Sequence, residues 1–201
     1  MVKQDLLATR TIGIATVLLA LLSSPSCETP PHLVIHQSDT ATVVLREMPV
    51  GYPTLTPFHH PYTIAPKEVF DILTSLHYEA GSLLPLSRSH PRSLFTKPQA
   101  ELLAPELSRA LTQALPQHVT AFTITDEEKP DRRTKGLAFV RDDELHVIIE
   151  ELHRLRYEGE QPTYQQPVSR WSLFTSGNHR HYARHPGGKG EATNWIITPL
   201  R

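Results

Sequence analysis

The most uniform part of the hydrophobic pattern lies near the N-terminus, where Ile12–Leu22 contains no charged residue. Lys3 and Arg10 precede this run, and three serines and a proline separate it from Cys27. A transmembrane helix needs about 20 apolar residues, so the run is too short to cross a membrane comfortably. A basic start, a short apolar run and small residues after it are typical of a secretory signal. We therefore predict that residues 1–26 are a signal peptide.

The end of this signal resembles those of bacterial lipoproteins, in which a cysteine directly after the apolar run is diacylated and becomes the mature N-terminus. Such signals usually carry an aliphatic residue three positions before the cysteine, where this chain has Ser24. The resemblance implies a lipid on Cys27, a tether over residues 27–32 and a place on the bacterial cell envelope, facing the periplasm. Glu28, rather than aspartate, after the cysteine implies the outer membrane rather than the inner one.

Two alternatives to lipidation stay open from the residues alone. An ordinary signal peptidase would cleave after Ser26 and leave Cys27 with a free thiol, and an uncleaved signal would act as an anchor. A free thiol at the N-terminus of an exported protein is open to oxidation, which favours modification of this cysteine. Two acyl chains would hold the protein stably on a membrane, whereas a single chain is marginal.

The rest of the chain alternates in ways that predict strands, most clearly in one hairpin. Leu137–Arg141 and Glu144–Ile149 flank Asp142-Asp143, which predicts two strands joined by a two-residue turn. In that register Val140 faces Leu145, Ala138 faces Val147, Phe139 faces His146, Leu137 faces Ile148 and Arg141 faces Glu144. Each pair is chemically compatible. Both faces are partly apolar, so these strands are expected at the centre of a sheet.

Two segments have helical periodicity instead. Pro66 suits the start of a helix that places Val69, Phe70, Leu73 and Leu76 on one side, with Ile72 beside them. In the second segment, Thr96 and Gln99 have the spacing of a capping box. Pro105 lacks a backbone N–H, so we expect the helix to break there and restart. The apolar stripe after the restart consists of Leu107, Ala110, Leu111, Ala114 and Leu115.

The remaining pattern completes a small α+β domain over residues 33–201. Further strands are expected at Leu33–Ile35, Thr42–Leu45, Val119–Thr125, Trp171–Phe174 and Asn194–Ile197, and a proline-rich loop at 49–66. The period of Glu150–Tyr157 is ambiguous between strand and helix. The fold class predicted is an antiparallel sheet with about two helices packed on one face, preceded by the signal segment.

Composition sets limits on this domain. A chain of 201 residues that is 39% hydrophobic and 20% charged, with a net charge of −1, is sufficient for one packed domain. Its single cysteine cannot form an internal disulfide. Common catalytic signatures are missing from the sequence, including the Gly-x-Ser-x-Gly elbow and His-Glu-x-x-His, and Gly187–Gly190 lacks the spacing of a phosphate loop. We therefore assign no catalytic residue and expect no cofactor.

Histidines offer one candidate for chemistry. His179, His181 and His185 fall within seven residues of a glycine-rich loop, a set that could bind a divalent metal, Zn²⁺ or Cu²⁺. The alternative function that follows is a periplasmic metal-binding protein or a hydrolase using this loop. The other interpretation is a solvated polar loop. His146, opposite Phe139, is expected to be a packed sheet histidine.

Charge is distributed unevenly along the mature chain. Residues 126–160 hold 11 acids against 7 bases, whereas 161–201 hold 5 bases against one acid. Arg180, Arg184 and Lys189 could therefore contact an anionic surface of lipid or polysaccharide. The alternative is that the two segments pair with each other.

The function that we expect is that of a cell-envelope lipoprotein with a non-catalytic binding or structural domain. Its partners would be the membrane, reached through the lipid anchor, and another envelope protein or an anionic polysaccharide. Nucleic acid is not expected as a partner because of the export signal.

Overall fold

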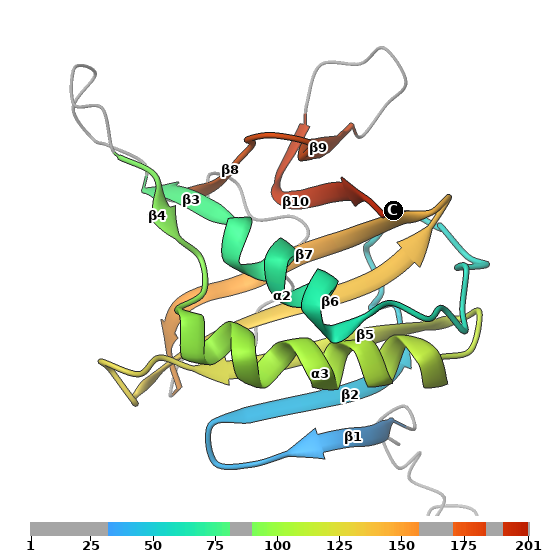
Figure 1. The fold of residues 1–201 in the computed structure, drawn as a ribbon, viewed down its shortest axis with the longest axis horizontal. Helices are drawn as coiled ribbons and strands as arrows, with labels where there is room; N and C mark the ends of the chain where they lie inside the picture. The colour runs from blue at the N-terminus through green and yellow to red at the C-terminus, as the bar shows by residue number, and fades with distance from the viewer. Residues whose placement is uncertain (1–31, 81–89, 157–170, 184–190, 201) are drawn as a thin grey trace, which may run out of the picture. The chain divides into compact units, whose positions relative to one another are not determined.

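The apolar repeats of the mature chain correspond to ten strands and two helices in the described part of the computed structural model, which covers residues 32–80, 90–156, 171–183 and 191–200 (Figure 1). In chain order these are β1 Leu33–Gln37, β2 Ala41–Glu47, α2 Pro66–Ser75, β3 His77–Ala80, β4 Arg92–Ser93, α3 Lys97–Gln113, β5 His118–Thr125, β6 Arg132–Arg141, β7 Glu144–Leu155, β8 Trp171–Phe174, β9 Arg180–Ala183 and β10 Glu191–Pro199.

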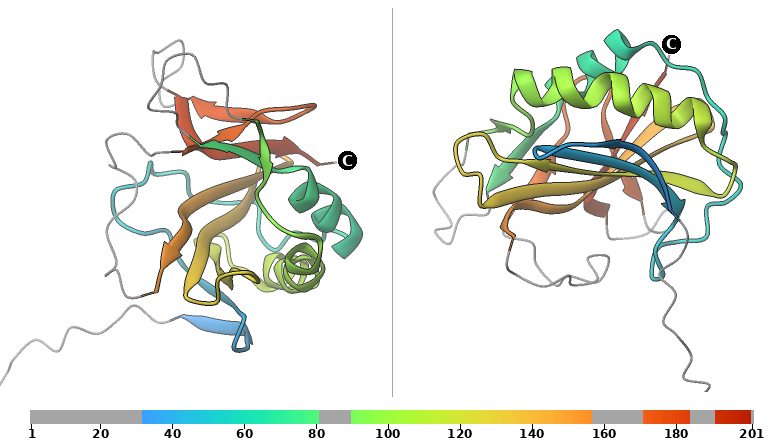
Figure 2. Two further views of the ribbon diagram at one scale, coloured as in Figure 1. Left: turned by 90° about the vertical axis from the view of Figure 1, so that its left-hand side faces the viewer. Right: turned by 90° about the horizontal axis from the view of Figure 1, so that it is seen from below.

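Seven strands form one antiparallel sheet in the order β1-β2-β5-β6-β7-β10-β9, and β4-β3-β8 form a small second sheet. Both helices lie on the same side of the main sheet, as the two views of Figure 2 show. The predicted α+β class is therefore confirmed. Residues 31–201 group into one compact unit. Within the described residues, no helix combines the length and the apolar character needed to cross a membrane.

The β6–β7 hairpin has the predicted register. Val140 pairs with Leu145, Phe139 with His146 and Arg141 with Glu144. Asp142 and Asp143 form the turn with φ of 53° and 56°, the left-handed conformation that a tight two-residue hairpin turn requires. Aspartate tolerates this conformation better than most residues. The central position of both strands in the sheet is confirmed as well.

Helix α2 begins at Pro66 as expected and buries Val69, Ile72 and Leu73. Helix α3 begins with the predicted capping box, in which the Thr96 hydroxyl accepts from Gln99 N and the Gln99 side chain accepts from Thr96 N at 2.9 Å. A single helix then runs through Pro105, so the expected break there is wrong. Pro105 faces solvent, and the residues on either side of it keep the helix packed on the sheet.

Two separate apolar clusters form on the two faces of the main sheet. The cluster under the helices joins residues of α2 and α3 to one face, including Val43, Phe122 and Val140. The opposite face carries Leu137, Phe139, Ile148 and Trp195 with other buried residues. The proline-rich segment after β2 covers part of this second face through Phe58, Tyr52, Leu55 and Met48. We call the first the helix-covered face and the second the loop-covered face.

The proline-rich segment contains no helix or strand between residues 48 and 65, as predicted, yet it is tied to its neighbours. His59 N donates to Val140 O at 2.9 Å, and Val140 N donates to His60 Nε2 at 3.4 Å. Tyr62 N donates to Leu111 O. Strand β5 begins at His118, and its pairing with β6 ends at Thr120–Ala138. The loop therefore occupies the edge of β6 that β5 leaves open.

The last third of the chain departs from the expectation in three places. Glu150–Leu155 continues β7 as a strand, which resolves the ambiguous period. Strand β8 pairs with β3 in the second sheet instead of joining the main one. Residues 180–183, expected to be loop, form β9 and pair with β10. A strand of only four residues between glycine-rich segments gives too short a pattern to be recognised.

Candidate functional site

The structure describes only part of the set of site residues predicted from the sequence. His179 directly precedes β9, and Arg180 and His181 belong to it. Cys27, Arg184, His185 and Lys189 lie outside the described residues. The lipidation of Cys27, the metal site and the anionic-surface contact therefore stay predictions, and only the surroundings of His179, Arg180 and His181 can be described.

His181 links the two sheets. Its Nε2 lies 2.9 Å from the carbonyl oxygen of Leu173 in β8, so this nitrogen carries the proton and donates. Because β9 belongs to the main sheet and β8 to the small one, the bond fastens one sheet to the other.

His179 lies between α2 and β10 and has both ring nitrogens engaged. Nε2 lies 2.8 Å from Ser75 Oγ, at the end of α2, and Nδ1 lies 2.7 Å from Thr198 Oγ1, in β10. Ser75 Oγ donates to Ile72 O at 2.6 Å. The Ser75 proton is thereby committed to a carbonyl, so Ser75 accepts from Nε2–H and Thr198 donates to Nδ1. This arrangement assigns a neutral imidazole protonated on Nε2.

The pKa of His179 supports a neutral ring. Burial lowers this pKa below its usual range because the charged imidazolium would lose hydration, and nearby His77 lowers it further. His77 Nδ1 donates to the Ser75 carbonyl at 2.8 Å, so it is oriented beside the same helix end.

These contacts bear on the predicted metal site. Within the residues that the structure describes, no three His, Cys, Asp or Glu side chains gather closely enough to hold an ion. His179 would have to give up a hydrogen bond to Ser75 or Thr198 to become a ligand, and His181 Nε2 would have to leave Leu173. The two described histidines thus serve as links between structural elements.

Arg180 forms an ion pair with Glu144 at the start of β7. Glu144 belongs to the acidic segment 126–160, so this contact favours the interpretation in which the acidic and basic segments pair with each other. The Arg180 side chain is still 55% exposed, which limits the pair's contribution to stability to below about 1 kcal/mol.

A cleft of about 610 Å³ opens beside His179. Its lining combines Ser75, His179 and Thr198 with the apolar side chains of Ile72, Ala65 and Pro199. Lys67, Glu68 and Asp71 of α2 also line it, which gives these charged groups a net charge of −1. Lys67 forms an ion pair with Asp71. We call this the His179 cleft. A few convergent polar groups on a partly apolar concave surface are typical of small-ligand sites.

A second cleft, of about 470 Å³, lies along the proline-rich loop. Its lining includes Met48, Val50, Tyr52, Leu55 and Phe58, with Glu47 and Gln117 as polar members. Thr54 and Thr56 also line it, but its lining contains no histidine.

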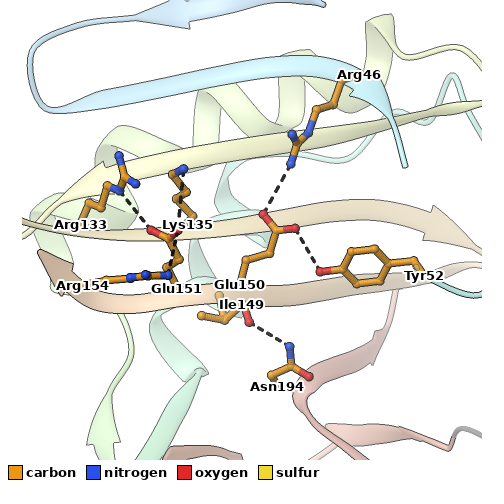
Figure 3. A network of polar contacts seen from close by, with 9 residues as sticks. All are labelled: Arg46, Tyr52, Arg133, Lys135, Ile149, Glu150, Glu151, Arg154 and Asn194. Atoms are coloured by element: carbon orange, nitrogen blue, oxygen red, sulfur yellow. Dashed lines mark hydrogen bonds and ion pairs between the residues drawn. The ribbon is translucent and has the colours of Figure 1, made fainter. Parts of the chain in front are cut away.

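Two consecutive glutamates of β7 contact basic side chains and a tyrosine hydroxyl (Figure 3). Glu150 Oε1 accepts from the Tyr52 hydroxyl at 3.0 Å, and Arg46 Nη2 lies 3.5 Å from Oε2. Burial raises the pKa of Glu150 above its usual range, and Arg46 and the Tyr52 hydrogen bond offset part of this rise. The network thus fastens the proline-rich loop and β2 to the loop-covered face.

Glu151 is enclosed by three basic side chains. Arg133 Nε lies 3.1 Å from Oε2, and Arg154 and Lys135 nitrogens lie 3.7 and 3.9 Å from Oε1 (Figure 3). The pairing register shifts at this point, since Gly136 pairs with Ile149 and Lys135 with Glu151. Glu150 is therefore the extra residue of a β-bulge. Neither of the two clefts above is lined by Glu151, and its three basic partners all belong to β6 and β7, so we interpret this cluster as structural.

The histidine motif of the sequence directed attention to the region of the His179 cleft but not to its partners. Ser75 lies 104 residues before His179 and sits in a helix chosen only for its apolar spacing. Thr198 is one of many strand threonines. A long-range hydrogen bond of this kind has no local sequence signal. His146, in contrast, is the packed sheet histidine that was expected, with its ring stacked on Phe139 at 4.7 Å.

No protein-family model, no curated protein and no solved structure matches this chain.

Proposed function

We propose that this chain is an exported lipoprotein, anchored to the cell envelope through Cys27, whose domain binds a small ligand in the His179 cleft without chemical turnover. The sequence pattern carries the anchor: a basic start, an apolar run over Ile12–Leu22, then three serines and a proline, and then Cys27. The observation that carries the binding site is a neutral histidine held by two hydroxyls within a cleft of about 610 Å³.

The chemistry of the cleft indicates the class of ligand. The hydroxyls of Ser75 and Thr198 and the imidazole of His179 are polar groups without charge, and the charged residues of α2 sum to −1. An anionic ligand would be repelled by this balance. The cleft therefore suits an uncharged or cationic molecule that carries hydroxyl or amine groups, such as a sugar or an amino sugar.

Labelling with a fatty acid tests the anchor. Cells that express the wild-type chain should incorporate the label into this protein, and a Cys27→Ser variant should not. As a matched control, Ser26→Ala leaves the cysteine in place and should still be labelled. Equal labelling of the wild type and the Cys27→Ser variant would show that no lipid is attached at Cys27.

Ligand-observed NMR with glucosamine and N-acetylglucosamine tests the cleft. Both probes should show saturation transfer with the wild-type protein, and the signal should be lost in Thr198→Val, which removes one hydroxyl from the cleft and keeps the side-chain shape. Thr123→Val, a substitution of the same kind in β5, is the control and should leave the signal unchanged. Binding of neither probe by the wild type, or equal binding by both variants, would contradict a ligand site here.

One observation favours a second function, a serine hydrolase. Ser75 Oγ and His179 Nε2 lie 2.8 Å apart and both line the cleft, which is the spacing of a nucleophile and its general base. Catalysis would require the other neutral tautomer of His179, with Nδ1–H donating to Thr198 Oγ1, so that the Ser75 hydroxyl could turn from Ile72 O and donate to the unprotonated Nε2. Covalent labelling by a fluorophosphonate, lost in Ser75→Ala and kept in Ser93→Ala, would establish this function. No labelling of the wild type would leave the cleft as a binding site.

A further inference from the structure

The exposed apolar side chains of the domain are not scattered. Within the residues that the structure describes, four large apolar side chains are exposed: Leu33 at 54%, Val34 at 45%, Val50 at 100% and Leu115 at 48%. Leu33 and Val34 begin β1, Val50 follows β2, and Leu115 lies between α3 and β5.

The strand register places all four at one end of the main sheet. Leu33 pairs with Leu45 near the end of β2, and Glu47 pairs with His118 at the start of β5. Strands β1, β2 and β5 are neighbours in the sheet, so their ends lie side by side. In Figure 1 this end is on the right, where β1 begins and the loop after β2 departs. We call the four residues the apolar end.

The sequence fixes how far this end can lie from the proposed anchor. Leu33 is the sixth residue after Cys27, and an extended chain spans at most about 3.6 Å per residue. Leu33 therefore lies within roughly 20 Å of the lipidated residue, whatever path the tether takes. The opposite end of the sheet, at the turn formed by Ser38 and Asp39, is connected to the tether only through β1.

We propose that the apolar end rests on the lipid bilayer and orients the domain on the membrane. This inference depends on the proposed lipid anchor, because the tether is what holds the end within reach. Apolar side chains at the interface leave water for the acyl chains, which is favourable without any charge attraction.

Charge at the same end determines the kind of bilayer. Asp142 and Asp143 form the turn between β6 and β7, and Glu144 pairs with Pro199. Asp142 forms an ion pair with Arg141 and Glu144 with Arg180, so most of the charge at these strand ends is paired. Charges that are largely paired give neither strong attraction to an anionic bilayer nor strong repulsion from it, and the little that remains would be screened by salt. A zwitterionic surface is therefore the occupant that fits, and contact with it should be insensitive to salt.

The experiment uses the lipidated full-length protein, purified from membranes and reconstituted in phosphatidylcholine vesicles. Acylation blocks Cys27, so Val50→Cys supplies the only reactive thiol for a fluorophore. Asp39→Cys supplies a matched probe at the opposite end, and both positions are exposed, which keeps the fold undisturbed. Nitroxide-labelled lipids should quench the probe at position 50 and leave the probe at position 39 unquenched, at low and high salt alike.

The outcomes separate the proposals. Quenching at position 50 alone supports the orientation. Equal quenching at both positions, or none at position 50 in protein that still floats with the vesicles, would overturn it while the anchor stands. If Cys27→Ser protein floats as well as the wild type, the anchor is wrong instead. The fluorophore at position 50 could instead become shielded from water only at high protein density, without quenching by the lipids. That result would mean that a second copy covers the apolar end, and it too would overturn the inference.

Discussion

The two faces of the main sheet are covered in different ways, and their polar content differs accordingly. Helices α2 and α3 cover one face with buried aliphatic and small residues such as Leu73, Ala100 and Leu103. The proline-rich loop covers part of the other, where aromatic rings gather and His146 and Glu150 lie among them. The Tyr52 hydroxyl of the loop donates to Glu150, and the Trp195 indole of β10 donates to His146. The loop-covered face therefore carries buried titratable groups.

The aromatic rings of the loop-covered face form a continuous cluster. Tyr182 stacks on Trp195 at 3.9 Å, and Phe139 stacks on His146 at 4.7 Å. Trp195 Nε1 donates to His146 Nδ1 at 3.2 Å, which requires an unprotonated nitrogen. Protonation of this ring would therefore break a buried hydrogen bond as well as place a charge among aromatic side chains.

The largest effect is expected from a charge on the helix-covered face. Val140→Asp would bury a carboxylate opposite Leu145, where the cluster offers no partner among the described residues, and should lower the free energy of unfolding by roughly 4 kcal/mol or more. Val44 lies on the loop-covered face, two residues from Arg46 on the same side of β2. The variant Val44→Asp should therefore lower the free energy of unfolding by only about 1–2 kcal/mol.

Urea unfolding of both variants checks this difference between the faces. Equal losses in Val140→Asp and Val44→Asp would show that the two faces do not differ as described. An unchanged midpoint for Val140→Asp would place Val140 in solvent and contradict the hairpin register.

The free energy of unfolding should also depend on pH, because of buried histidines associated with the loop-covered face, and this effect is smaller. Burial lowers the pKa of both His60 and His146 to about 4. Between pH 6.5 and 4 the unfolded chain binds protons that the folded protein does not, so the stability present above pH 6.5 falls as the pH decreases. Each histidine should contribute a loss of about 2 kcal/mol between pH 7 and pH 5.

The variant His146→Phe removes the contribution of His146 to this loss of stability on acidification and leaves that of His60. Phenylalanine keeps a ring over Phe139 but cannot be protonated, so the loss between pH 7 and pH 5 should shrink by about 2 kcal/mol relative to the wild type. Urea unfolding at the two pH values gives the comparison. The same loss in both proteins would mean that His146 is not held neutral by burial.

The smallest effect is expected for Glu150→Gln. Glutamine still accepts from the Tyr52 hydroxyl and removes a buried charge, so the unfolding free energy at pH 7 should change by less than about 1 kcal/mol. Because the pKa of Glu150 is raised on folding, the folded protein gains stability from this group as the pH falls. The variant lacks that gain and should therefore lose stability more steeply on acidification. A shallower loss in the variant would contradict the raised pKa.

How much the sequence predicts depends on how local the interactions are. The hairpin register followed from five facing pairs and a two-residue turn, and both helices followed from apolar spacing and a capping box. The predicted break at Pro105 was wrong because the rule against proline inside a helix considers only the backbone. It does not take into account the buried residues before and after Pro105, which hold the helix on the sheet. Strand β9, the bulge at Glu150 and the contacts of His179 depend on partners far away in the chain, for which no local pattern exists.

The mass of the mature N-terminal peptide tests the central claim, a lipid anchor on Cys27, most directly. Protein extracted from membranes and digested with a protease should yield a peptide that begins at Cys27 and carries diacylglycerol on its sulfur. A peptide that begins at an unmodified Cys27, or one that still contains residues 1–26, would contradict the anchor and with it the orientation proposed for the apolar end.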